Sequence, residues 1–186
     1  MSHYFHHIRL LFSNPPKAWH NIKKDDGSYK RLFFGPVILV IAGMSLCLLV
    51  GESLSMASTG LFIDIIKHAL IFFVANLLSF YIISVFINAI ISSFTGKKDM
   101  ARVGQLLLYT LSPYYFVMSV FYIFPSLIFI LLVPVYCFVL LWFGVKQLIE
   151  IPSDKITGFY IVTALIVVGI NLISHFVFNY AFLKVI

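Results

Sequence analysis

Charged residues are scarce in this chain. They make up 11% of its 186 residues, whereas hydrophobic residues make up 61%. A soluble domain has roughly 25% charged and about 45–50% apolar residues, so a water-soluble core could not bury this apolar content. The composition therefore indicates an integral membrane protein and excludes a disordered chain. Because the basic residues lie in short segments between apolar runs, it also argues against a nucleic-acid partner.

Cysteines and catalytic motifs are equally scarce. Cys47 and Cys137 both lie inside apolar runs, which excludes a disulfide framework or a CxxC metal site. There is no phosphate-binding glycine-rich loop, no His-Glu-x-x-His and no paired nucleophile and base. His3, His6 and His7 have helical spacing, but no nearby carboxylate or thiol completes a tetrahedral metal site. We therefore expect a protein that is not an enzyme and has no metal or cofactor.

Long apolar runs are what the chain has. A helix that crosses the roughly 30 Å hydrocarbon core needs about 20 such residues. Between Arg102 and Lys146 lie 43 uncharged residues, enough for two crossings, with Pro125-Ser126 to break the helix between them. The runs predict five spans, at about 32–50, 68–94, 103–124, 126–145 and 157–183. We therefore predict an all-α integral membrane protein with a five-helix domain over 32–186, preceded by a cytoplasmic amphipathic segment over 1–31.

The distribution of Lys and Arg predicts the orientation of these spans. Eleven basic residues would lie on one side of the membrane: Arg9, Lys17, Lys23, Lys24, Lys30, Arg31, Lys97, Lys98, Arg102, Lys146 and Lys155. Only Lys67 and Lys184 would lie on the other. Because cytoplasmic loops retain positive charge, we expect the N-terminus in the cytoplasm and the C-terminus outside.

The N-terminal segment has the pattern of two short interfacial helices. Ser13 or Asn14 can cap the second, which starts with Pro15-Pro16. Trp19 on its apolar face is predicted to anchor at the headgroups. The basic residues around it that would attract anionic lipid are Lys17, Lys23, Lys24 and Arg31. The alternative is that these helices cover the cytoplasmic ends of the bundle.

Polar residues within the spans form two groups. Asn171, Ser174, His175 and Asn179 make one stripe on the fifth span, and Asn76, Ser84 and Asn88 make a wider sector on the second. Lipid cannot satisfy their hydrogen bonds, so we expect both groups to face protein, as helix contacts or as a ligand site.

Prolines and small residues give two further patterns. Pro113 and Pro134 lie at similar distances from the hairpin and either kink their helices or mark a site at mid-membrane. If a polar cavity exists, its candidate lining is Asn76, Tyr109, Ser112, Tyr136, Asn171 and His175. Gly43, Cys47 and Gly51 form a ridge of small residues that predicts a close helix contact.

Short motifs along the chain resemble those of the Yip-domain family of membrane proteins, which interact with Ypt/Rab GTPases, and of its bacterial inner-membrane branch. Before the first span the match is Phe33, Phe34, Gly35 and Pro36, with Leu32 where the eukaryotic motif has Asp. Further along, the matching residues are Tyr109, Pro113, Pro125, Tyr136 and Gly144. The resemblance implies a five-span, non-enzymatic protein of a bacterial inner (plasma) membrane.

Two functions follow as hypotheses. The first is a Yip-like multi-pass protein that organises membrane lipids, membrane-protein partners or copies of itself. It rests on the motif at 33–36, the basic segment around Trp19 and the lack of charged residues within the predicted spans. The alternative is a transporter or channel for a small, mostly neutral solute. It rests on Pro113, Pro134 and the polar stripe of the fifth span.

The orientation can be tested with single cysteines introduced into a Cys47→Ser/Cys137→Ser background. In intact cells, cysteines at Ser28, Lys98 and Ser153 should resist an impermeant thiol reagent, whereas one at Lys184 should be labelled, because five crossings separate the two termini. If 103–145 were a single long span, Ser153 would be labelled and Lys184 protected.

Overall fold

The computed structural model describes residues 2–25, 27–55 and 62–185, and this part of the chain is almost entirely helical, with no strand. The elements are α1 (Ser2–Ser13), α2 (Pro15–Lys24), α3 (Tyr29–Leu32), the π-helix η1 (Phe33–Val37), α4 (Ile38–Ser55), α5 (Phe62–Ile90), the 3₁₀-helix η2 (Ile91–Phe94), α6 (Met100–Ile123), the 3₁₀-helix η3 (Ile128–Val135), α7 (Tyr136–Leu148) and α8 (Ile156–Val185). The predicted all-α fold with short N-terminal helices is confirmed.

Five helical stretches of the described chain are long and apolar enough to cross a membrane. They are Tyr29–Ser55, Phe62–Phe94, Met100–Ile123, Ile128–Leu148 and Ile156–Phe178. The first two extend beyond the predicted runs, and α4 therefore includes Glu52, which the sequence analysis placed outside the span. The number of spans and the hairpin around Pro125-Ser126 agree with the prediction.

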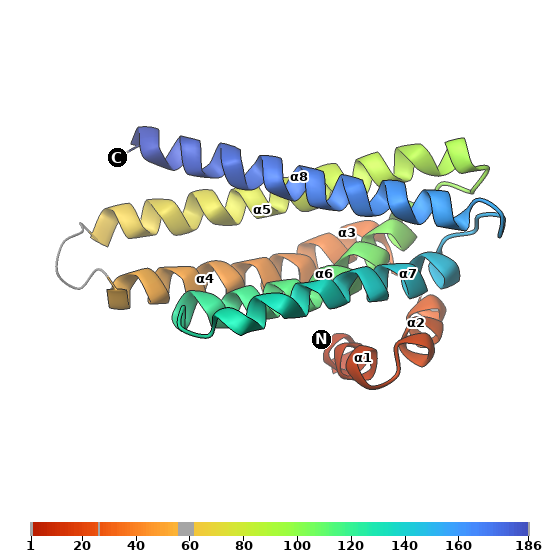
Figure 1. The fold of residues 1–186 in the computed structure, drawn as a ribbon, viewed down its shortest axis with the longest axis horizontal. Helices are drawn as coiled ribbons and strands as arrows, with labels where there is room; N and C mark the ends of the chain where they lie inside the picture. The colour runs from red at the N-terminus through yellow and green to blue at the C-terminus, as the bar shows by residue number, and fades with distance from the viewer. Residues whose placement is uncertain (1, 26, 56–61, 186) are drawn as a thin grey trace.

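The spans run alongside one another as a bundle (Figure 1). Helix α4 packs against α5 and α6, α7 packs against α6, and α8 lies mainly along α5. We call the end with Lys30–Arg31, the 95–99 connection and Lys146 the basic end. The end with Ser55, Phe62 and the 124–127 hairpin is the hairpin end. α6 is the most enclosed span: every residue from 103 to 113 is buried.

The first span begins with an irregular turn. The Ser28 side chain accepts a hydrogen bond from the Arg31 backbone N–H (3.3 Å) and caps α3. Pro36 has no N–H to donate to a helical bond, and the chain around it widens into the π-helix η1. Phe33 stacks against Tyr29, while Phe34 is 73% exposed and points away from the bundle.

The two intramembrane prolines do not form a matched pair. Helix α6 continues through Pro113, which is buried. The fourth span instead starts as the 3₁₀-helix η3, which contains Pro134 and becomes α-helical at Tyr136. The two breaks thus differ in form, and nothing in this geometry favours a transport site built from paired breaks.

The ridge of small residues makes one close contact rather than three. A Cβ added at Gly51 would lie 1.9 Å from the carbonyl oxygen of Tyr122, so α4 and α6 approach at this point as only glycine permits. Gly43 has nothing within 4 Å of its added Cβ, and Cys47 is partly exposed. The predicted contact is therefore confirmed at Gly51 and wrong at Gly43, which faces away from the other helices.

Gly51→Ala should lower the free energy of unfolding by about 3 kcal/mol, because the new methyl group would force the two helices apart. Gly43→Ala is the matched control on the same helix and should leave stability unchanged or slightly raise it, since alanine favours helix. Thermal unfolding in detergent measures both variants. Equal stability of the two would contradict the close approach at Gly51.

Candidate functional site

The N-terminal helices α1 and α2 pack against the side of the bundle, next to α6 and α7 (Figure 1). The Asn14 side chain accepts a hydrogen bond from the Lys17 backbone N–H (3.2 Å) and caps α2, as expected. Trp19 is fully buried among the apolar core residues. The prediction that its ring anchors at the headgroups is wrong, because the ring packs on Leu106 and Gly144. The alternative interpretation is that these helices cover the cytoplasmic ends of the bundle; they do pack on protein, but along the side of α6 and α7.

Helix α1 reaches the middle of the spans. The Tyr4 hydroxyl lies 2.9 Å from the Ser112 hydroxyl, near the midpoint of α6. Ser112 donates to the Leu108 carbonyl (2.6 Å), which leaves it to accept from Tyr4. Where α7 begins, the Tyr136 hydroxyl donates to the Leu11 carbonyl (2.8 Å). The segment is therefore held against the side of the membrane-spanning helices and does not merely lie over their ends.

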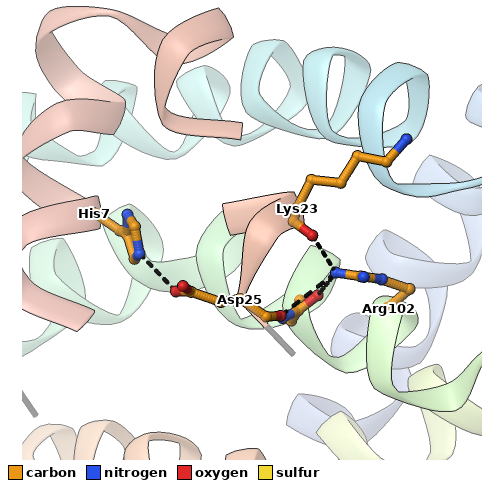
Figure 2. A network of polar contacts seen from close by, with 5 residues as sticks. His7, Lys23, Asp25 and Arg102 are labelled. Atoms are coloured by element: carbon orange, nitrogen blue, oxygen red, sulfur yellow. Dashed lines mark hydrogen bonds and ion pairs between the residues drawn. The ribbon is translucent and has the colours of Figure 1, made fainter. Parts of the chain in front are cut away.

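A polar network holds the chain that leaves α2 (Figure 2). His7 Nε2 lies 2.8 Å from Asp25 Oδ2. Arg102 Nη1 donates to the Lys23 carbonyl (2.9 Å) and to the Gln105 side chain (3.1 Å), and Gln105 Nε2 donates to the Asp25 carbonyl (2.8 Å). The network joins α1, the α2–α3 connection and the start of α6. It provides hydrogen-bond donors for backbone carbonyls at the end of α2, which have no partner within the helix.

Tyr109 lies at the centre of this interface. Its ring is 5.8 Å from that of His7 and 6.2 Å from that of Trp19, both edge to face, and 5.7 Å from that of Tyr4. The residue is only 6% exposed. Such aromatic clusters add to the free energy gained from burial alone. Tyr109 therefore joins α1 and α2 to α6.

Gly144 provides the space for Trp19. A Cβ at Gly144 would lie 2.5 Å from Leu106 Cδ1 and 2.8 Å from Trp19 Cζ2, so no larger residue fits without a shift. Tyr109, Tyr136 and Gly144, three of the residues that carry the family resemblance, thus all contact the N-terminal helices. Pro125 lies in the hairpin and takes no part in this interface.

The six residues predicted to line one polar cavity lie in two places. Tyr109, Ser112 and Tyr136 face α1 and α2. Asn76, Asn171 and His175 lie together on another side of the bundle, around a hollow between α5, α6 and α8. The single cavity is therefore wrong. The physical reason is helical periodicity, since α6 presents Tyr109, Ser112 and Pro113 on one face and Thr110, Tyr114 and Met118 on another.

Several polar groups of the spans bond to their own helices. Asn76, Ser84 and Asn171 each donate to the carbonyl four residues earlier in their own helix, at 2.9, 2.8 and 2.7 Å. His175 is exposed rather than enclosed by protein. The side chain of Asn179, the fourth residue of the predicted stripe, lies outside the described residues.

Among the larger hollows that adjoin this group, two also contact α6. One, of about 490 Å³, lies near the hairpin end between α4, α5, α6 and α8. The other, of about 360 Å³, is an apolar cleft between α6, the fourth span and α8. Tyr122 and His175 line both.

The first hollow contains an acid–base pair that sequence reasoning missed. His68 Nδ1 lies 2.5 Å from Glu52 Oε1, and both side chains are largely shielded. Glu52 lies just beyond the first predicted span, and His68 is the first residue of the second. The signal that could have found the pair is that the two residues lie at the facing ends of two consecutive predicted spans.

The histidines of α1 do not share one environment. His7 is 4% exposed and pairs with Asp25, while His6 points outward. The side chain of His3 lies outside the described residues. Among the side chains that the structure describes, no group of three His, Cys, Asp or Glu is placed to hold a metal ion.

The fold and these sites define a multi-pass membrane protein with five helical spans and an N-terminal helix pair packed on their side. The family model of the Yip1 domain matches residues 8–174. The chain therefore belongs to the Yip1 domain family, and the match includes the second half of α1 and all of α2. Neither the curated proteins nor the solved structures contained a match to this chain.

The docking of α1 should weaken at alkaline pH. Burial raises the pKa of Tyr4 from 10.0 to about 12, with a smaller opposing effect from its hydrogen bond to Ser112. When α1 is released the hydroxyl ionises near pH 10, so between pH 10 and 12 the released form binds fewer protons and docking loses stability as pH rises. The full contribution, about 3 kcal/mol, is present below pH 10.

Fluorescence of Trp19 in a Trp142→Phe background measures this release, since the emission should shift to the red as Trp19 meets water. Tyr4→Phe is the control, because phenylalanine cannot ionise, and it should remove the shift between pH 10 and 12. An unchanged alkaline transition in Tyr4→Phe would show that another group controls it.

Proposed function

We propose that this Yip-family protein is a non-catalytic organiser of its membrane that binds anionic lipid headgroups at its basic end. The membrane would be a bacterial inner membrane, and the basic end would lie on its cytoplasmic side. Exposed basic residues on four neighbouring segments carry the proposal: Lys17, Lys23, Lys24, Lys30, Arg31, Lys97, Lys98 and Lys146. These segments are in contact, since α2 packs on α7 and α3 packs on α6.

The net positive charge of the chain comes from residues at the basic end. In the sequence, eleven basic and five acidic residues belong to it, whereas the hairpin end has two of each, and the net charge of the chain is +6. Basic residues near an anionic leaflet contribute about 1 kcal/mol each. The positive-inside rule, which gives the orientation of the spans, supports a cytoplasmic position of the same residues.

The packing of α1 and α2 supports a binding role rather than a catalytic one. Polar groups of α1 and of the facing helix α6 hold backbone carbonyls and one another in place, as in the contacts of His7, Arg102 and Gln105. The side chains that remain exposed are the basic residues of the basic end and apolar residues such as Phe12 and Phe34. A lipid surface, a membrane-protein partner or a second copy of the chain could meet this combination.

Lipid retention tests the proposal. Protein purified from bilayers that contain phosphatidylglycerol and phosphatidylcholine should keep bound phosphatidylglycerol, as counted by native mass spectrometry. Lys17→Gln/Lys23→Gln/Lys24→Gln should weaken that binding at least about tenfold, given about 1 kcal/mol per residue. Lys67→Gln, an exposed lysine at the hairpin end, is the matched control and should bind as the unmodified chain does. Equal retention by the triple variant and the control would contradict the proposal.

A further inference from the structure

The hairpin end carries a second site whose two parts differ in chemistry. The hollow of about 490 Å³ has Glu52 and His68 among apolar lining residues, and the cleft of about 360 Å³ is lined mainly by apolar side chains such as Leu141 and Val168. The two share Tyr122 and His175 as lining residues. A polar hollow that adjoins an apolar cleft suits a ligand with a polar head and an apolar chain.

The charged side chains of the first hollow determine which kind of ligand headgroup it can bind. Among the lining residues that the structure describes, Glu52 is the only carboxylate of the first hollow, and neither hollow has a Lys or Arg. A headgroup that carries only negative charge would therefore meet a carboxylate without a cation, whereas a zwitterionic headgroup brings its own cation to Glu52. The pair with His68 uses the Oε1 oxygen of Glu52, and an ionised carboxylate can accept about four hydrogen bonds. Glu52 can thus accept further bonds from a group rich in N–H donors.

The surroundings of the pair hold it in place. The His68 ring stacks on Phe178 at 4.9 Å between centroids, and Phe178 in turn packs on Phe72. An ionisable residue on a spanning helix is costly to shield from water and commonly serves a function. Glu52 lies one turn before the end of α4, so a lipid headgroup at that level can reach it while its chain lies along α8.

We propose that these hollows bind one aminophospholipid, with its primary ammonium on Glu52, its phosphate beside His175 and Tyr122, and an acyl chain in the cleft between α6 and α8. An ammonium group donates three hydrogen bonds, whereas the trimethylated amine of phosphatidylcholine donates none. The site therefore distinguishes the two lipids. It lies at the opposite end from the basic residues of the proposed function and does not depend on them.

Competition between lipids tests this site. The full chain is incubated with equal amounts of phosphatidylethanolamine and phosphatidylcholine of identical acyl chains, and the bound lipid is counted by native mass spectrometry. Phosphatidylethanolamine should be preferred about tenfold, the effect of one hydrogen bond to a charged group. Glu52→Gln should abolish the preference, while Asp64→Asn, an acidic residue of the same end that lines neither hollow, should keep it.

A second variant tests the cleft without touching the charged pair. Val168 is exposed and lines the cleft, so Val168→Trp should fill it and reduce retention of phosphatidylethanolamine while unfolding remains unchanged. Equal binding of the two lipids by the unmodified chain, or a preference that survives Glu52→Gln, would overturn the proposal. The triple lysine variant separates the two sites: phosphatidylethanolamine binding that survives in it supports the site at Glu52, and its loss would place the lipid at the basic end instead.

Discussion

The space that Gly144 leaves between α6 and α7 is the constraint on which the N-terminal half of the structure depends. Trp19 occupies that space, and any larger side chain at position 144 would collide with it and with Leu106. With the ring in this position, α2 lies along α7. The carbonyls of the residues at and after its end then lie beside Arg102 and Gln105. Burial of one tryptophan thus determines where a polar network forms. The N-terminal helices belong to the core of the bundle and are not an appendage on its surface.

Helix α6 supplies two sites from its two faces. One face holds α1 through Tyr109 and Ser112, and the other forms the cleft toward α8 through Thr110 and Tyr114. Because successive turns of one helix carry both faces, movement of α6 toward the N-terminal helices would also alter the cleft. The close approach at Gly51 ties the same helix to α4 near the hollow at the hairpin end.

The sequence was sufficient to predict the number of spans, the hairpin and the cap at Asn14, because run lengths and local hydrogen bonding decide them. It predicted the outward-facing lysines but not the burial of Trp19, since an apolar ring beside basic residues has the same pattern at a headgroup and at a helix interface. The candidate cavity rightly grouped Asn76 with His175. It wrongly added Tyr109, Ser112 and Tyr136, because the sequence does not show the rotation of each helix. The pairs His7–Asp25 and Glu52–His68 join separate elements and follow from no local pattern; only the position of Glu52 and His68 at the facing ends of consecutive spans points to the second pair.

Helix α1 lies against the middle of the spans. A spin label at Phe12, which is exposed and stacks on Tyr136, measures its depth in a bilayer directly. A label at Val139, exposed one turn further along α7, provides the reference. We predict that both labels collide frequently with dissolved oxygen and rarely with a water-soluble nickel chelate. A label at Phe12 that meets the chelate as often as one at Lys24 would place α1 at the membrane surface and contradict the account.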